Sequence, residues 1–184
     1  MELATYVELH KYLNKVYENP HKEYECIHVT GTNGKGSFVW KCAHLLEKAL
    51  QSKAKASNVV NRVCISETDF VKYLNQVLNE EYQITKAFQR FEKQANKRFV
   101  LTIFEITTLI AFLYFRDRNV KMAVIEVGMG GKYDTTNIIH SPLLAVITHV
   151  ALDHCQWLGN TVEQITLEKA GIIKTGCRVL LGNY

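Results

Sequence analysis

The sequence predicts an α/β domain in which a mostly parallel sheet lies between two layers of helices. Three short runs of apolar and β-branched residues, at about 26–30, 122–127 and 143–150, have the length of buried strands and are separated by helical patterns. The first run ends in a glycine-rich turn that leads directly into a helical pattern. Strand, glycine-rich loop and helix in this order are typical of a P-loop-containing three-layer αβα domain.

Helical periodicity accounts for most of the chain between the strands. Asn19-Pro20 ends an amphipathic pattern, and Ser66 and Thr102 each stand three residues before an acidic residue, which is typical of a helix N-terminus. The pattern from 106 to 115 is apolar on nearly all sides, which indicates burial between layers. We expect helices over about 2–19, 38–51, 66–78, 84–97, 102–115 and 161–171, a loop over 52–61 and a last strand over 178–181.

Length and composition agree with one globular domain. The chain has 184 residues, of which 47% are hydrophobic and 22% charged, so it can bury a core. The net charge of +4 is modest and not gathered in one block, which does not favour a nucleic-acid partner. The most apolar run, 109–115, is too short to span a membrane, and the N-terminus lacks a secretory pattern. We therefore expect a cytoplasmic protein without membrane contact.

The five cysteines indicate neither a disulfide framework nor a zinc site. Their number is odd and no two of them form a C-x-x-C pair. We expect reduced, mostly buried thiols. The sequence does not reveal the oligomeric state, and a monomer is the default expectation.

The carboxyl ends of the predicted strands are the expected location of the functional site. Parallel strands end on the same edge of a sheet, and ligands of such sheets bind there. In this chain those ends are the segments 31–37, 126–131 and 148–154. We expect these three distant segments to converge on one crevice.

The segment 31–37 has the features of a phosphate-binding loop. Its backbone N–H groups and the helix dipole can point at one anion, Lys35 adds a mobile charge, and the Ser37 hydroxyl can ligate Mg²⁺. Its spacing departs from the Walker pattern, because only two residues separate Gly31 from Gly34 and Gly36 follows the lysine. A glycine-rich turn alone can be purely structural, but the lysine, the hydroxyl and the strand–helix setting favour phosphate. The residues predicted to bind nucleotide here are Gly31, Thr32, Asn33, Gly34, Lys35, Gly36 and Ser37.

Polar residues at the other strand ends are candidates for metal binding and catalysis. Glu126 lies within an apolar strand, where an unpaired carboxylate is costly to bury, so it needs a partner. Mg²⁺ beside a triphosphate is one such partner, and a buried salt bridge or hydrogen bond is the alternative. Asp153-His154 is a second polar pair, although a solitary histidine more often has a structural role. The Glu168-Lys169 pair, judged by pattern alone, belongs to a solvated helix face.

Four ordered motifs resemble one known family. They occupy residues 28–37, 101–105, 126–137 and 153–172. In this order they are similar to the folylpolyglutamate synthase/dihydrofolate synthase family, a branch of the Mur-ligase-like ATP-dependent amide ligases. The resemblance extends from about residue 3 to 176 and implies that residues 1–184 form a Mur-ligase-like ATP-binding domain. On this resemblance we expect that the carboxyl-terminal glutamate-ligase domain of that family is not present in the chain.

The resemblance implies an ATP- and Mg²⁺-dependent amide ligase. In this family ATP phosphorylates a carboxylate of folate or dihydropteroate, and the amino group of glutamate then displaces phosphate. A carboxylate is a poor electrophile, whereas an acyl phosphate carries a good leaving group. The expected partners are therefore small molecules: ATP, glutamate and a folate or dihydropteroate. The resemblance does not choose between the two pterin substrates, and a mitochondrial form stays open beside a cytoplasmic one.

The resemblance also assigns roles to single residues. Lys169 corresponds to a lysine that the family carbamylates, and Lys132-Tyr133 stands where Arg-Leu is usual, which keeps the charge. The implied residues are Lys35, His154 and Lys169 for catalysis, Asn137 with the phosphate loop for ATP, Asp134 and Thr136 for the substrate, and Ser37, Glu126 and His154 for Mg²⁺.

Two departures from the family keep a second interpretation open. A Thr-Ser-Pro-His-Leu type loop, whose serine ligates a second Mg²⁺ in the family, has no counterpart between Leu50 and Ser66. The family is also more than twice this length. The alternative is a nucleotide-binding protein of the same fold without ligase activity. A P-loop kinase or GTPase is a weaker alternative, because the loop spacing differs and no guanine-selecting motif is found.

Overall fold

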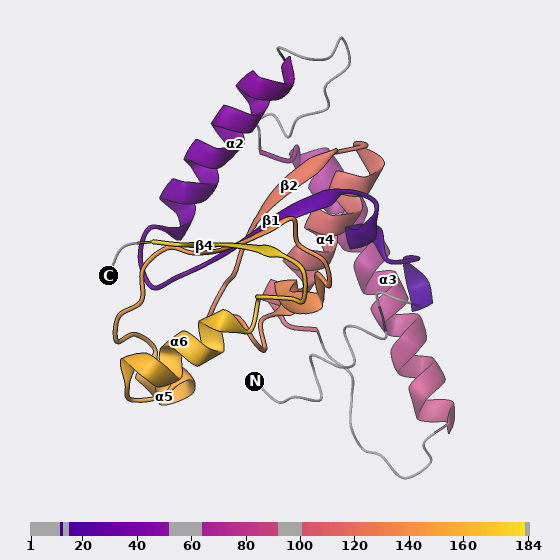
Figure 1. The fold of residues 1–184 in the computed structure, drawn as a ribbon. Coiled ribbons are helices and arrows are strands. Elements are labelled where there is room, and N and C mark those ends of the chain that lie inside the picture. Colours follow the sequence, from indigo (N-terminus) through magenta and orange to yellow (C-terminus); the bar gives the residue numbers. More distant parts are fainter. Residues whose placement is uncertain (1–11, 13–14, 52–63, 92–100, 183–184) are drawn as a thin grey trace.

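Four strands form one parallel sheet at the centre of the molecule. The computed structural model describes residues 12, 15–51, 64–91 and 101–182 (Figure 1). The sheet has the order β2-β1-β3-β4, and each adjacent pair is parallel. The strands are β1 (Glu25–Thr30), β2 (Met122–Glu126), β3 (Leu144–Ile147) and β4 (Arg178–Leu181). The predicted parallel sheet is confirmed, with strands shorter than the apolar runs that predict them.

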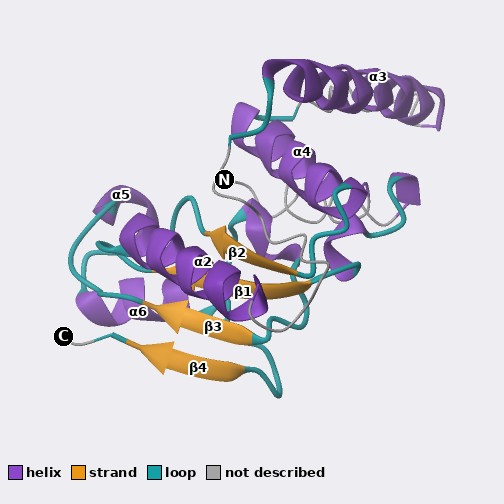
Figure 2. Ribbon diagram, turned by 90° about the horizontal axis from the view of Figure 1, so that it is seen from above, coloured by secondary structure: helices purple, strands orange, loops and turns teal. Residues whose placement is uncertain are grey.

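Helices cover both faces of this sheet. α2 (Lys35–Gln51) lies on one face, whereas α4 (Ile103–Asp117) and α6 (Val162–Ala170) lie on the other (Figures 1 and 2). α3 (Glu67–Phe91) packs against the outside of α4. Shorter elements are α5 (Cys155–Leu158) and the 3₁₀ turns η1 (Pro20–Lys22) and η2 (Thr135–Ile138). The predicted three-layer αβα arrangement is confirmed.

Side-chain alternation along the strands creates two cores. Ile27 and Val29 of β1 pack with Phe38 and other residues of α2 on one face. Cys26, one position away from Ile27, belongs to the larger core under α4. Successive side chains of a strand point to opposite faces, so a single apolar run supplies both cores. Leu109, which is fully buried, lies near the centre of the larger core.

The position of β1 brings three strand ends to one edge of the sheet. β1 pairs with β2 on one side, where Val29 is opposite Glu126, and with β3 on the other, where Thr30 is opposite Ile147. The N–H of Thr148 donates to the Thr30 carbonyl at 2.9 Å, which continues the ladder beyond β3. The predicted convergence of the segments that follow β1, β2 and β3 is therefore confirmed.

Three expectations about helices and strands were wrong or lie outside the described residues. Separate helices over 66–78 and 84–97 were expected, but α3 is continuous from Glu67 to Phe91, because no glycine or proline interrupts that stretch. Residues 92–97 and 52–61, and most of 2–19, lie outside the described residues. All four residues of β4 are exposed, so the expectation of strands covered on both faces fails there.

All five cysteines are free thiols, as expected. The expectation that most of them are buried is wrong, because only Cys26 is buried and Cys64 is exposed.

Within the described part of the chain, no helix combines the length and apolar character needed to cross a membrane.

The capping box at the start of α4 gives a test of local stability. The Thr102 hydroxyl accepts a hydrogen bond from the Glu105 N–H, and the Glu105 carboxylate accepts one from the Thr102 N–H at 2.6 Å. We expect Thr102→Ala to lower the free energy of unfolding by about 1 kcal/mol, because one N-terminal N–H loses its acceptor. The measurement is denaturant unfolding, with Thr107→Ala as control, since exposed Thr107 binds only carbonyls within its own helix. Equal stability of both variants would contradict the role of the cap.

Candidate active site

The loop between β1 and α2 has a backbone that requires glycine. Gly31 and Gly34 have φ values of 150° and 83°, which other residues rarely adopt. A Cβ on Gly31 would also overlap the Thr148 hydroxyl. α2 begins at Lys35, so the unpaired N–H groups of its first turn lie in the loop itself. The predicted strand–loop–helix geometry is confirmed, and its ligand stays a prediction.

The segment that follows β3 holds this loop in place. The Thr148 hydroxyl donates to the Asn33 carbonyl at 2.6 Å. The N–H of Thr32 donates to the His149 carbonyl at 2.6 Å, and the Thr32 hydroxyl bonds both the N–H and the carbonyl of Ala151, each at 3.1 Å. Nothing in the sequence pattern singles out Thr148, because a threonine after a strand has no signature of its own.

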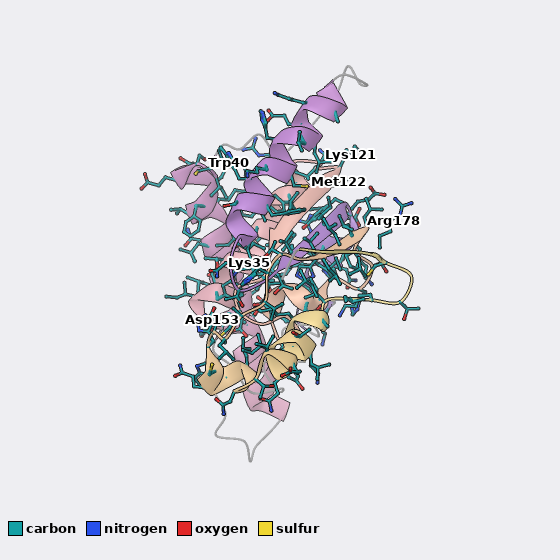
Figure 3. All side chains as sticks on the ribbon, turned by 60° about the vertical axis from the view of Figure 1, so that its left-hand side comes forward. Lys35, Trp40, Lys121, Met122, Asp153 and Arg178 are labelled. Atoms are coloured by element: carbon teal, nitrogen blue, oxygen red, sulfur yellow. The ribbon has the colours of Figure 1, made fainter. Side chains whose placement is uncertain are left out.

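Two lysines lie close together at this edge. Lys35 Nζ donates to the carbonyls of Gly31 at 2.9 Å and Thr32 at 3.3 Å, so the side chain folds over the loop (Figure 3). Lys169 is only 2% exposed. Burial and, after it, the nearby charge of Lys35 lower the pKa of Lys169 to about 8, and Asp153 opposes the shift. The interpretation of Glu168-Lys169 as a solvated pair was therefore wrong for the lysine.

Glu126 lies beside the phosphate loop as expected, but for a different reason. It is the last residue of β2 and is exposed, so the premise of a buried carboxylate was wrong. Its Oε2 lies 3.5 Å from the point that a Cβ on Gly36 would occupy, next to Ser37. The Glu126 carboxylate therefore lies beside the first turn of α2, which contains Gly36 and Ser37.

His154 follows by three residues Ala151, whose backbone bonds Thr32 of the phosphate loop. Its backbone is left-handed, with a φ of 48°, and its side chain is half exposed. Nε2 lies 3.6 Å from Oδ2 of Asp153. Among the described residues, no three side chains of His, Cys, Asp or Glu are grouped so as to hold a metal ion. Glu126 and His154 are thus available singly, and their metal role stays a prediction.

A buried chain of hydrogen bonds holds the loop after β2. The Asp134 carboxylate accepts from the N–H of Met129 at 3.0 Å, the N–H of Thr136 at 2.9 Å and the Thr136 hydroxyl at 2.6 Å. The Thr136 oxygen lies 2.8 Å from Nε2 of His28. Burial raises the pKa of Asp134, and these hydrogen bonds partly offset the shift. Asp134 and Thr136 are almost fully buried, so their predicted contact with substrate stays untested.

Asn137 ties the same loop to the end of α6. Its Nδ2 donates to the carbonyls of Lys132 at 3.0 Å and Gly171 at 3.1 Å. Lys132 N–H in turn donates to the Glu168 carbonyl at 2.8 Å. The predicted contact of Asn137 with nucleotide is likewise untested, whereas its role in joining the loop to α6 is shown by the geometry.

The comparisons with known proteins decide the family. A model of the Mur ligase middle domain matches residues 29–178. The chain belongs to the Mur ligase family. The relatives that the chain matches are named folylpolyglutamate and dihydrofolate synthases. A folylpolyglutamate synthase from Lacticaseibacillus casei is 40% identical over 170 residues, which are 90% of this chain and 39% of that protein.

Solved structures agree with this assignment. A Mycobacterium tuberculosis folylpolyglutamate synthase complexed with ADP and AMPPCP is 30% identical, with a TM-score of 0.73 over 96% of this chain and 41% of that one. A complex described as FPGS with AMPPCP and folate is 38% identical, with a TM-score of 0.73 over 97% of this chain and 43% of the other. The chain spans about two fifths of the length of the curated relatives it matches.

An aromatic side chain completes the edge of the Mur ligase site. Phe104, near the start of α4, covers the backbone of Gly128, where a Cβ would lie 2.5 Å from the ring. The ring is 38% exposed, and Gly128 follows Glu126 by two residues. A partly exposed aromatic ring therefore lies beside the end of β2 in this Mur ligase domain.

The burial of His28 predicts a specific acid sensitivity of this Mur ligase domain. Burial, with the charge of Lys174 adding to it, lowers the pKa of His28 to about 3, against about 6.5 in an unfolded chain. The unfolded state then binds more protons between these values, so stability is complete above about pH 6.5 and falls as the pH is lowered. We expect a loss of up to about 1.4 kcal/mol per pH unit in this window that His28→Gln lacks. Denaturant unfolding at several pH values checks this, and parallel curves for the two proteins would contradict it.

Proposed function

We propose that the full-length protein is an ATP- and Mg²⁺-dependent amide ligase that joins glutamate to a carboxylate of folate or dihydropteroate. One observation carries the proposal: in a chain of the Mur ligase family, the Glu126 carboxylate lies beside the phosphate loop and the buried Lys169 lies near Lys35. The names of the relatives support it, since they are folylpolyglutamate and dihydrofolate synthases. The reported complex with AMPPCP and folate supports ATP and folate as the ligands.

The phosphate loop would bind the triphosphate of ATP. The backbone N–H groups of residues 31–37 and the dipole of α2 favour an anion at this place. Lys35 Nζ, which now bonds two neutral carbonyls, would exchange them for phosphate oxygens, because hydrogen bonds to charged acceptors are stronger. Asn137 is proposed as a further nucleotide contact, in agreement with the family resemblance.

The residues beside the loop suit Mg²⁺. The Ser37 hydroxyl and the Glu126 carboxylate are hard oxygen donors, which Mg²⁺ prefers, and His154 adds an imidazole. Few protein ligands are needed, because Mg²⁺ at phosphate sites usually binds phosphate oxygens and water as well. When bound, the ion neutralises charge on the phosphoryl group that is transferred. Ser37, Glu126 and His154 would hold it.

The reaction needs two successive substitutions, the first at the γ-phosphorus of ATP and the second at the acyl carbon. A carboxylate oxygen of the pterin substrate forms a bond to the γ-phosphorus while the bond to ADP breaks. The amino group of glutamate then attacks the acyl carbon, phosphate leaves and the nitrogen loses a proton. Lys35 would stabilise the negative charge of the transferred group, as a positioned cation does in phosphoryl transfer.

Lys169 would support this site as a carbamate. A pKa of about 8 leaves a sizeable neutral fraction near physiological pH, and only the neutral amine attacks CO₂. The N–C bond forms, one proton is released, and the lysine gains a negative head close to Lys35. This chemistry matches the carbamylated lysine that the family resemblance implies.

The surface near Gly128 would receive the pterin substrate. The exposed ring of Phe104 can stack on an aromatic ring at this edge. Asp134 and Thr136, proposed from the family as substrate residues, are buried, so they would act mainly through the loop backbone that they hold.

The ligase assay tests the function directly. ATP, Mg²⁺, glutamate and either folate or dihydropteroate are incubated with the full-length protein, and products are identified by mass spectrometry. We expect glutamylated product together with ADP and phosphate. Folded protein that binds ATP in calorimetry but forms no product would instead support a nucleotide-binding protein without ligase activity.

Lys35 provides the first variant. We expect Lys35→Ala to weaken ATP binding about 10- to 100-fold, because a hydrogen bond between charged groups contributes about 1.5–3 kcal/mol. Lys41→Ala removes an exposed lysine of the same helix and serves as the matched control. Calorimetric titration with ATP and Mg²⁺ measures both. Unchanged affinity in Lys35→Ala would refute the phosphate loop.

Thr148 provides the second variant. Thr148→Val keeps the shape but removes the hydroxyl that holds the Asn33 carbonyl, so we expect the KM for ATP to rise about 5- to 30-fold. Thr148→Ser keeps the hydroxyl and should stay within about 2-fold of wild type. Steady-state kinetics distinguish the two, and equal KM values in both variants would show that the hydroxyl does not position the loop.

A further inference from the structure

We infer that His28 is a positioning residue of the proposed ligase site, which it serves by fixing the loop after β2 through Thr136 and Asp134. The expected effect on catalysis rests on the proposed function, whereas the role of His28 in holding the loop rests on hydrogen-bond geometry. His28 lies in the middle of β1, is fully buried and contacts no solvent. The sequence pattern gives it no functional setting.

The direction of each hydrogen bond in this chain follows from the one before it. The Thr136 hydroxyl donates to Oδ1 of Asp134, and the two oxygens of that carboxylate also accept the N–H groups of Met129 and Thr136. The single proton of that hydroxyl is then used. The Thr136 oxygen must accept from His28, which fixes the neutral imidazole with its proton on Nε2.

This chain determines the shape of the loop. Asp134 draws the N–H groups of Met129 and Thr136 toward one carboxylate and so closes residues 129–136 into a compact turn. The Thr30 hydroxyl donates to the Gly130 carbonyl at 2.5 Å and adds a second tie from β1 to the same turn. The strand that precedes the phosphate loop therefore holds the neighbouring loop at two points.

The compact turn over residues 129–136 also determines where Lys169 lies. A Cβ on Gly131 would lie 2.8 Å from the Lys169 carbonyl and 2.9 Å from the Glu168 carbonyl, so the two backbones are in contact. Lys132 N–H donates to the Glu168 carbonyl at 2.8 Å. A displacement of the turn would therefore move the end of α6 and the lysine that it carries.

The cost of this histidine supports a positioning role. Its Nδ1 is buried and has no hydrogen-bond partner among the described residues, and an unsatisfied buried acceptor costs about 1–3 kcal/mol. A well-packed apolar side chain at this strand position would avoid that cost. What His28 supplies that an apolar residue does not is one N–H donor aimed at Thr136.

The phosphate loop is held by other residues, which separates the two effects. Its ties run to Thr148, His149 and Ala151 on the opposite side of β1. Loss of the His28 donor should therefore lower kcat through the turn and Lys169 by a larger factor than it weakens ATP binding, which it can reach only through Asn137. General destabilisation would instead change both in proportion to the unfolded fraction.

The test compares two substitutions at His28 in the full-length protein. His28→Gln carries an amide nitrogen at about the position of the imidazole Nε2 and keeps the donor, whereas His28→Leu has no donor. We expect His28→Leu to lower kcat about 10- to 100-fold, since a displacement of about 1 Å can cost about 10²-fold in rate. Its Kd for ATP should rise by a clearly smaller factor, about 3-fold or less through Asn137, and His28→Gln should keep kcat within about 3-fold. Wild-type kcat in folded His28→Leu, or equal loss in both variants, would overturn the inference.

Hydrogen exchange gives a measurement that does not depend on turnover. The N–H groups of Met129 and Thr136 bond Asp134, so we expect them to exchange about 10-fold faster in His28→Leu than in wild type or His28→Gln. Equal protection in all three proteins would show that His28 does not fix the turn. An inactive wild-type protein would refute the proposed function, while the exchange rates would still decide the role of His28.

Discussion

The parallel pairing of β1 with both β2 and β3 is the constraint on which the site depends. Because all three strands run in one direction, the residues that follow them leave the sheet at one edge. The phosphate loop, Glu126 and the segment around Thr148 therefore lie at one edge of the sheet although they are far apart in the sequence. None of these groups suffices for the proposed site alone, and the register of the strands brings them together.

Local pattern was sufficient for the layers of the fold and for one part of the site. Apolar runs predict the strands, glycines with a lysine predict the loop, and parallel direction predicts convergence. The same pattern misjudged Glu126, because an apolar run does not show which residue is its last and therefore exposed. It also divided α3 in two, since a polar stretch without glycine or proline can continue a helix.

Residues that act through distant partners could not be found from pattern. His28 and Thr136 are 108 positions apart and Thr148 and Asn33 are 115 apart, so neither pair leaves a local periodicity. Lys169 is the opposite case, because it was predicted as a site residue although its local pattern gave no reason for it. Its place on a helix predicts solvent, and only the resemblance of its motif singled it out, whereas burial under the loop after β2 explains its low pKa.

The two lysines indicate why the parts of this site belong to one function. Lys35 and Lys169 place two ammonium groups near each other, one of them buried, and like charges repel more strongly where water is excluded. Asp153 offsets only part of that repulsion, because the pKa of Lys169 still falls to about 8. A triphosphate at the loop, as proposed, would add negative charge that stabilises both ammonium groups, and the proposed carbamate on Lys169 would replace one of them by a negative group. The proposed anion site and the buried lysine are thus two parts of a single electrostatic arrangement.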